Sequence, residues 1–253
     1  MIFRLLLCFF LTITTEFVIV SYLKNLLIIF LGIESDTIKV FVICILFVII
    51  YIEVIMMIKH LYLMRHGETL FNKRRKIQGW CDSPLTENGI LQAKAAKKCL
   101  DNIDFDHYYS STAERCCDTL EIITDYKKPY KRLKQLKERN FGDFEGESED
   151  LNPKRGSEFN YDDLFPHYGG EYTQDVIERM SKCLKEIMEN EDHKNVLVVS
   201  HGGACYSFLS TVTDPNIVRD NGGFTNCCIL HFEYNDGKFK YVDIMRPDLN
   251  ILG

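Results

Sequence analysis

The sequence lacks an excess of basic charge, and it lacks the cysteine spacings of a metal or disulfide site. Its 253 residues carry a net charge of −6, which argues against a general nucleic-acid-binding protein. The ten cysteines include two adjacent pairs but no C-x-x-C motif, so we expect neither a zinc site nor a disulfide framework. Such cysteines are typical of small buried side chains in a reducing compartment. Repeats and low-complexity tracts are also absent, and the composition is that of a folded protein.

Two long apolar runs set residues 1–58 apart from the rest of the chain. Residues 5–23 and 40–58 are each close to the roughly 20 residues that a membrane-spanning helix needs, and each contains one acidic residue. If one or both of them span a membrane, the chain has an apolar N-terminal anchor. The distribution of basic residues then places residues 59–253 on the cytoplasmic face.

A mistaken start is the second interpretation of the apolar region. The stretch "MMIKHLYLMRHGET" would be an ordinary beginning for a protein that starts at Met56 or Met57. A membrane helix that ends at residue 58 would have almost no linker before the first expected strand, which begins near His60. With the later start, the protein would have no anchor and would be purely cytoplasmic.

Residues 59–253 alternate strand-like and helix-like patterns. Apolar, β-branched and aromatic runs predict strands, and the spacing of apolar residues predicts amphipathic helices. The alternation indicates a three-layer α/β domain. We expect strands near 60–65, 106–111 and 195–200, a hairpin over 227–244, helices near 86–100, 112–125 and 175–190, and a polar surface excursion over 143–170.

Two of the apolar strands end in a histidine followed by glycine. His66 follows "LYLMR", and His201 follows "VLVVS". In parallel neighbouring strands, both imidazoles would emerge at the edge where open α/β sheets bind ligands. Arg65 precedes the first histidine, and Arg115 lies one helical turn past the end of another strand. Two guanidinium groups and two imidazoles favour a multiply charged anion such as a phosphoryl group.

A phosphoryl group at this edge could be attacked by a neutral imidazole to give a phosphohistidine. Neighbouring cations would keep that imidazole deprotonated. An alkoxide leaving group also needs a proton donor. The candidate carboxyl groups are Glu68, Glu138, Glu145 and Glu171.

These residues carry a resemblance. From about residue 59 to its end, the chain resembles the histidine phosphatase superfamily, in its phosphoglycerate mutase-like branch and closest to the small broad-specificity phosphatases. Six segments match motifs of the family in the family's order: "RHGETLFN", "QGWCDSPLTENG", "YYSSTAERCCDT", "LKERNFGDFEG", "GGEYTQDVIERM" and "VVSHGG". The resemblance implies a mixed, mostly parallel sheet with helices on both faces.

The resemblance also implies roles for individual residues. His66 would be the nucleophile that becomes phosphorylated, and Glu138 would protonate the leaving oxygen and then activate water. No metal and no cofactor would be needed. The phosphoryl group would be bound by Arg65, Asn72, Arg115 and His201, and the expected rim of the pocket comprises Gln78, Gly79, Glu171 and Gly202. Glu171 is alternatively an acid that favours the N-terminus of the following helix.

Hydrolysis of a small phosphorylated substrate is the function that the sequence favours. Mutases of this family carry a longer, basic excursion after the acid loop, whereas "NFGDFEGESED" is acidic. Two alternatives stay open: mutase-type phosphoryl transfer, and a non-catalytic domain that binds phosphorylated ligands at a membrane. No motif indicates an oligomeric state.

Overall fold

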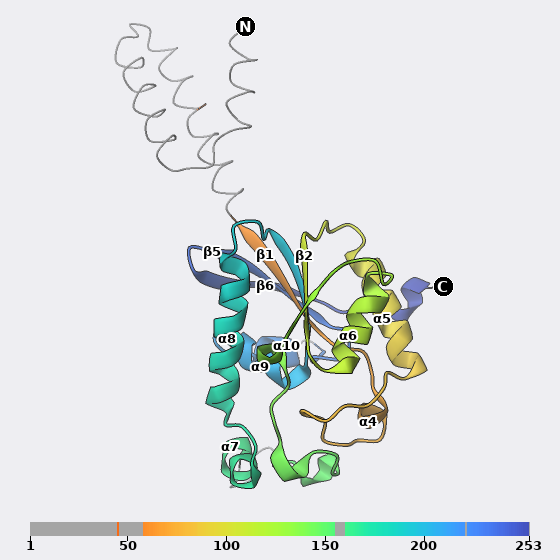
Figure 1. The fold of residues 1–253 in the computed structure, drawn as a ribbon, viewed down its shortest axis with the longest axis vertical. Helices are drawn as coiled ribbons and strands as arrows, with labels where there is room; N and C mark the ends of the chain where they lie inside the picture. Colours follow the sequence, from red (N-terminus) through yellow and green to blue (C-terminus); the bar gives the residue numbers. More distant parts are fainter. Residues whose placement is uncertain (1–44, 46–57, 155–159, 221, 253) are drawn as a thin grey trace, which may run out of the picture. The chain divides into compact units, whose positions relative to one another are not determined.

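The computed structural model describes residues 45, 58–154, 160–220 and 222–252 (Figure 1). The predicted membrane segments, 5–23 and 40–58, therefore lie outside the described residues except for Ile45 and Ile58. Among the helices of the described residues, none is long and apolar enough to cross a membrane. The anchor and the later start both remain predictions.

Six strands of the described residues form one sheet in the order β3-β2-β4-β1-β5-β6. The first four in this order run parallel, β5 is antiparallel to β1, and β6 is antiparallel to β5. This confirms the mixed, mostly parallel sheet. The strands are β1 (Lys59–Arg65), β2 (His107–Ser111), β3 (Lys131–Leu133), β4 (Asn195–Ser200), β5 (Ile229–Asn235) and β6 (Lys238–Met245).

Helices cover both faces of the sheet, so the three-layer α/β/α architecture is also confirmed (Figure 1). Successive side chains of a strand point to opposite faces. In β1, Leu61 and Leu63 pack with α8 and α9, whereas Tyr62 and Met64 pack with α5 and α6. The helices are α4 (Leu70–Lys73), α5 (Glu87–Leu100), α6 (Glu114–Ile123), α7 (Tyr161–Leu164), α8 (Thr173–Glu189), α9 (Gly202–Leu209) and α10 (Asn216–Asp220).

Helix starts follow local chemistry. The Thr86 hydroxyl accepts a hydrogen bond from the backbone N–H of Gly89, as expected for the N-cap of α5. The expected start of α6 near Thr112 is two residues too early. Ala113 keeps an extended backbone (φ −69°, ψ 136°), so the helix begins at Glu114.

The stretch over 143–170, which we expected to be a surface excursion, lies only partly on the surface. It contains short 3₁₀ turns and α7, but Phe165 within it is fully buried. The rings of Phe141, Phe144 and Tyr161 surround Phe165, with centroid distances of 4.8, 5.4 and 5.2 Å. Burying these aromatic surfaces stabilises a small second core beside the sheet edge.

Candidate active site

The carboxyl ends of β1 and β4 bring the two predicted histidines together. Arg65 pairs with Ser200 in the parallel register, so His66 and His201 each follow directly at the same edge. Their ring centroids lie 5.3 Å apart. The Arg115 guanidinium contacts both rings, at 3.2 Å from Nε to His66 Nε2 and 2.8 Å from Nη2 to His201 Nδ1. All three side chains are buried.

Glycine allows the loop after β1 to pack closely at this point. A Cβ on Gly67 would lie 2.7 Å from the carbonyl oxygen of Gly89, in the first turn of α5. The Gly67 N–H donates to the hydroxyl of Thr119 on α6, at 3.0 Å. The turn that carries His66 therefore lies close to α5, where a larger residue than glycine would clash, and is bound to α6 by the hydrogen bond to Thr119.

Hydrogen bonds determine the tautomers of both histidines. A guanidinium has no acceptor, so the ring nitrogens that face Arg115 must carry lone pairs. His66 Nδ1–H then donates to the Gly67 carbonyl at 2.8 Å, and His201 Nε2–H donates to the Ser111 hydroxyl at 2.8 Å. The lone pair of His66 is therefore on Nε2, the nitrogen on the side of the ring away from the Gly67 carbonyl.

Both rings are neutral at neutral pH. Burial lowers the pKa of His66 well below its usual range, and the positive charges of Arg115 and Arg65 lower it further. Burial, Arg115 and the neighbouring His66 act in the same direction on the pKa of His201. The cations thus act as expected from the sequence, but burial is the larger cause. A neutral imidazole retains the lone pair that a nucleophile needs.

Arg115 uses all five of its N–H donors. Besides the two histidines, it donates to the carbonyl oxygens of Gly79 and Cys81, at 2.8 and 3.0 Å, and to the Asp82 carboxylate at 2.9 Å. The acceptors on Gly79, Cys81 and Asp82 fix the orientation of the guanidinium. The Nε and Nη2 edge on the other side points toward the two histidines.

Arg65 contributes a second, differently placed cation. Its Nη1 donates to the Phe224 carbonyl at 2.7 Å, whereas its buried Nε has no hydrogen-bond partner among the described residues. A Cβ on Gly202 would lie 3.2 Å from this Nε, so a side chain there would crowd it. A buried N–H without a partner is unfavourable, and an anion would satisfy it.

Glu138 lies at the start of α9, beside the same edge. Its Oε1 accepts from the backbone N–H groups of Arg139 and Ala204, at 2.9 and 2.7 Å, and its Oε2 accepts from Gly203 at 2.8 Å. The side chain is buried. Oε2 takes one of these three bonds and retains a position for a proton. The structure thus places a carboxyl group close to the histidines, on the segment that follows β3.

A cavity of about 760 Å³ opens over this edge. Of the predicted site residues, its lining includes Arg65, His66, Asn72, Gln78, Glu138 and Gly202. Arg115 and His201 lie behind this lining and have no exposed surface. The volume is several times that of a phosphoryl group, which leaves space for an organic leaving group.

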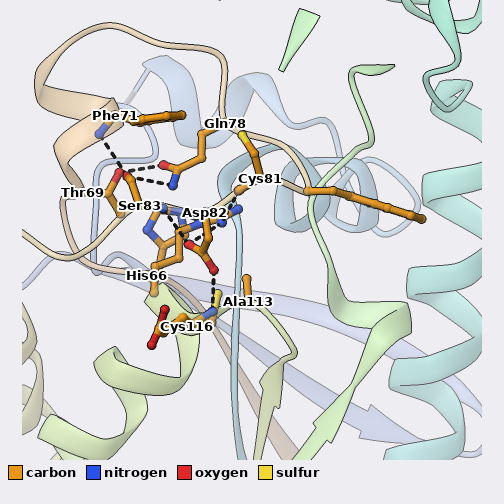
Figure 2. Close-up of polar contacts among 12 residues, drawn as sticks. His66, Thr69, Phe71, Gln78, Cys81, Asp82, Ser83, Ala113 and Cys116 are labelled. Carbon is orange, nitrogen blue, oxygen red and sulfur yellow. Dashed lines mark hydrogen bonds and ion pairs between the residues drawn. The ribbon is translucent and has the colours of Figure 1, made fainter. Parts of the chain in front are cut away.

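Asn72 and Gln78 hold the loop after β1. Asn72 Oδ1 accepts from the Thr69 N–H at 3.2 Å and from Asn226 at 3.2 Å, so its amide NH₂ is the part that could contact a ligand. The Gln78 amide accepts from the Thr69 hydroxyl at 2.6 Å and donates to the Ser83 hydroxyl at 3.0 Å (Figure 2). Gln78 therefore connects two parts of the loop at the cavity wall.

Gly79 and Glu171 are not among the residues that line the cavity. Gly79 acts through its carbonyl oxygen, which accepts from Arg115. The Glu171 carboxylate is instead paired with Arg179, at 2.9 and 3.0 Å. Sequence reasoning missed Arg179 because the two residues are eight positions apart, and no helical spacing of three or four residues links them.

One group of metal-ligand types occurs among the described residues, at the opposite edge of the sheet. The candidate ligand atoms of His107, Asp192 and His193 lie within 4.8 Å of one another. The two imidazoles, however, stack face to face, with centroids 3.7 Å apart and an interplanar angle of 9°. Their ring nitrogens also have protein partners: His193 lies 2.7 Å from the Tyr109 hydroxyl and 2.7 Å from Asp192, and His107 lies 2.9 Å from Asp106, so we assign no metal to them.

Comparison with known proteins agrees with this geometry. The family model of the histidine phosphatase superfamily (branch 1) matches residues 61–246. The chain belongs to this superfamily. The resemblance inferred from the six motifs is therefore confirmed, and the match spans the sheet from β1 to the end of β6.

Members of the histidine phosphatase superfamily with both phosphatase and mutase names resemble this chain. The uncharacterized phosphatase PhoE of Bacillus subtilis is 29% identical over 182 residues, which cover 72% of this chain and 91% of PhoE. The probable phosphoglycerate mutase GpmB of Proteus mirabilis is 31% identical over 185 residues, covering 69% and 85%. The phosphoserine phosphatase of Entamoeba histolytica, solved with 3-phosphoglyceric acid, is 27% identical with a TM-score of 0.62, covering 74% and 96%.

Membership of this superfamily makes the chain a phosphoryl-transfer enzyme. Its activity is that of a phosphatase or a mutase that works through a phosphohistidine.

Proposed function

We propose that this chain is a phosphomonoester hydrolase in which His66 is the nucleophile and Glu138 is the general acid and base. The observation that carries the proposal is the state of His66. This buried, neutral ring has its Nδ1–H bound to the Gly67 carbonyl and its Nε2 lone pair beside Arg115.

In the first half of the reaction, His66 Nε2 forms a bond to phosphorus while the bond from phosphorus to the ester oxygen breaks. The electron pair of that bond leaves with the ester oxygen, which takes a proton from Glu138. Arg65, Asn72, Arg115 and His201 bind the phosphoryl oxygens and offset their charge. The buried Nε of Arg65, which has no hydrogen-bond partner among the described residues, supports this role. For Arg115, the role requires Nε and Nη2 to exchange their bonds to the two histidines for bonds to the phosphoryl oxygens.

In the second half, Glu138 takes a proton from water. The resulting oxygen attacks phosphorus, and the bond to His66 Nε2 breaks. Inorganic phosphate leaves, and the imidazole regains its lone pair. Every proton and electron pair in both halves is carried by groups of this chain or by water, and we propose that the reaction needs no metal.

Charge at the acid loop supports hydrolysis over mutase chemistry. Glu149 lies in the cavity wall, in the stretch where a mutase of this family would need cations. Arg139 also lines the cavity, but its guanidinium is bound to Asp162 at 3.2 Å and to the Thr173 hydroxyl. The similarity to GpmB keeps the mutase reaction as the alternative. If 3-phosphoglycerate is supplied, only inorganic phosphate should appear; formation of 2-phosphoglycerate would show that the mutase assignment is right.

Replacement of His66 tests the nucleophile. The variant His66→Ala should lose turnover of p-nitrophenyl phosphate, whereas His167→Ala, which removes an exposed histidine, should retain it. In Glu138→Gln, the water step loses its base, so a rapid quench with radiolabelled activated ester should trap phosphate on His66. Full activity of His66→Ala would contradict the assignment.

A further inference from the structure

Arg179, in the second turn of α8, makes five hydrogen bonds that use every N–H of its guanidinium. Two go to Glu171, at 2.9 Å from Nε and 3.0 Å from Nη2. The other three go to backbone carbonyl oxygens of Gln135, Lys137 and Glu138, at 2.8, 2.6 and 2.9 Å. A side chain that meets three carbonyls of one short segment fixes the path of that segment.

The segment that Arg179 contacts is irregular and would otherwise lack donors. It runs from the 3₁₀ turn Lys134–Leu136 to Glu138, where no strand pairs with it. Backbone carbonyls that are buried need a partner. Ser200 supplies the bond to the Leu136 carbonyl at 2.8 Å, and the Trp80 indole N–H adds a second bond to the Glu138 carbonyl at 2.9 Å. Side chains therefore supply the donors for the carbonyl oxygens of residues 135–138.

Glu171 holds Arg179 in the orientation that this requires. Its two carboxylate oxygens meet the guanidinium in a bidentate pair, and both side chains are less than one-fifth exposed. The second oxygen also accepts from the Asn140 N–H at 2.8 Å. The pair thus spans residues 135–140, on both sides of Glu138.

From these contacts we infer that Arg179 is a positioning residue for the general acid. The backbone of Glu138 is held by Arg179 on α8, while its carboxylate is held by Gly203 and Ala204 on α9. Both helices therefore help to fix the position of the proton donor, together with the Trp80 indole and the Arg139 N–H. Arg179 does not line the cavity, so it does not act on the substrate directly. This inference rests on the proposed role of Glu138.

Two esters with different leaving groups separate this role from a general effect on folding. An alkyl phosphate such as glycerol 2-phosphate needs a proton on its leaving oxygen, whereas p-nitrophenyl phosphate hardly does. In the full chain, Arg179→Lys keeps the charge but loses the planar fork that reaches three carbonyls. We compare kcat/KM, which reports the first half of the reaction alone, because Glu138 also serves the water step that the two esters share. We expect kcat/KM for the alkyl ester to fall about 10- to 100-fold and that for the aryl ester to stay within about 3-fold. Lys182→Met, which removes an exposed charge from the same helix, should change neither.

A double variant tests whether Arg179 acts through Glu138. In the Glu138→Gln background, Arg179→Lys should cause almost no additional loss on the alkyl ester, because the group that it positions is gone. Additive losses, or equal losses of Arg179→Lys on both esters, would overturn the inference. If Arg179→Lys does not fold, Glu171→Gln provides the same test with a smaller, equally selective loss. Equal losses of kcat/KM on both esters in Glu138→Gln itself would instead refute the proposed acid.

Discussion

Acidification should destabilise the folded protein through His66 and His201. Both rings are buried and neutral, and their pKa values are lowered well below the ordinary value of about 6.5. Below that pH, the unfolded chain takes up protons that the folded protein excludes. Stability contributed by the two neutral rings is therefore fully present above about pH 6.5 and is lost as the pH falls toward the folded-state pKa values.

The magnitude follows from the two titrations. Between about pH 7 and about pH 5.5, each histidine that stays neutral when folded should cost about 1.3 kcal/mol, so the pair should cost about 2.5 kcal/mol. With a urea m-value of about 2–3 kcal/mol per molar, the unfolding midpoint should fall by about 1 M. Other groups titrate in the same range, so a difference between variants is the quantity to measure.

Urea unfolding of the wild type and of His66→Asn at the two pH values isolates one ring. The loss of stability on acidification should be smaller in the variant by about 1.3 kcal/mol, whatever the variant's stability at neutral pH. The same experiment with the exposed His167→Asn should leave the loss unchanged. An equal loss in wild type and His66→Asn would refute the view that this ring is held neutral by burial and by its cationic neighbours.

Three further predictions concern the site and the chain start. In Arg115→Met, a charge that lowers the pKa of His66 is gone, so the acid limb of the kcat/KM profile should move to higher pH; an unmoved limb would mean that another group titrates there. A Cβ on residue 203 would lie 2.7 Å from Glu138 Oε1, so Gly203→Ala should lower kcat/KM for alkyl phosphates far more than for p-nitrophenyl phosphate; equal losses of kcat/KM in steady-state kinetics would contradict this. Mass spectrometry of the native N-terminus should find a peptide upstream of residue 56 if the apolar anchor is real, and none if translation begins later.

Much of the fold could be predicted from local pattern. Thr86 starts α5 as its position before an amphipathic run indicates, and the apolar run of β4 lies parallel between two neighbours. The 143–170 stretch could not be predicted in the same way. Its polar composition hid Phe165, because an isolated aromatic residue becomes core only when other rings surround it.

Some residues of the candidate site could likewise be predicted from local pattern, and others could not. His66 and His201 are visible in the sequence, because each stands where an apolar strand meets glycine. Arg179 is not visible, since a helical arginine is by default a solvated charge. Its three carbonyl partners and Glu171 lie far enough away in sequence that no spacing connects them.

The amino-acid sequence by itself determined the strand–helix alternation and the family, together with the chemical types of the groups at the sheet edge, because these depend on short-range periodicity and on residue identity. Only the tertiary structure decided that His66 and His201 are buried and neutral, that Arg115 and His201 lie behind the cavity lining, and that Glu171 pairs with Arg179 and lies away from the cavity. Burial, charge proximity and hydrogen-bond partners depend on which distant segments meet, and strand register and helix packing set these across the whole domain.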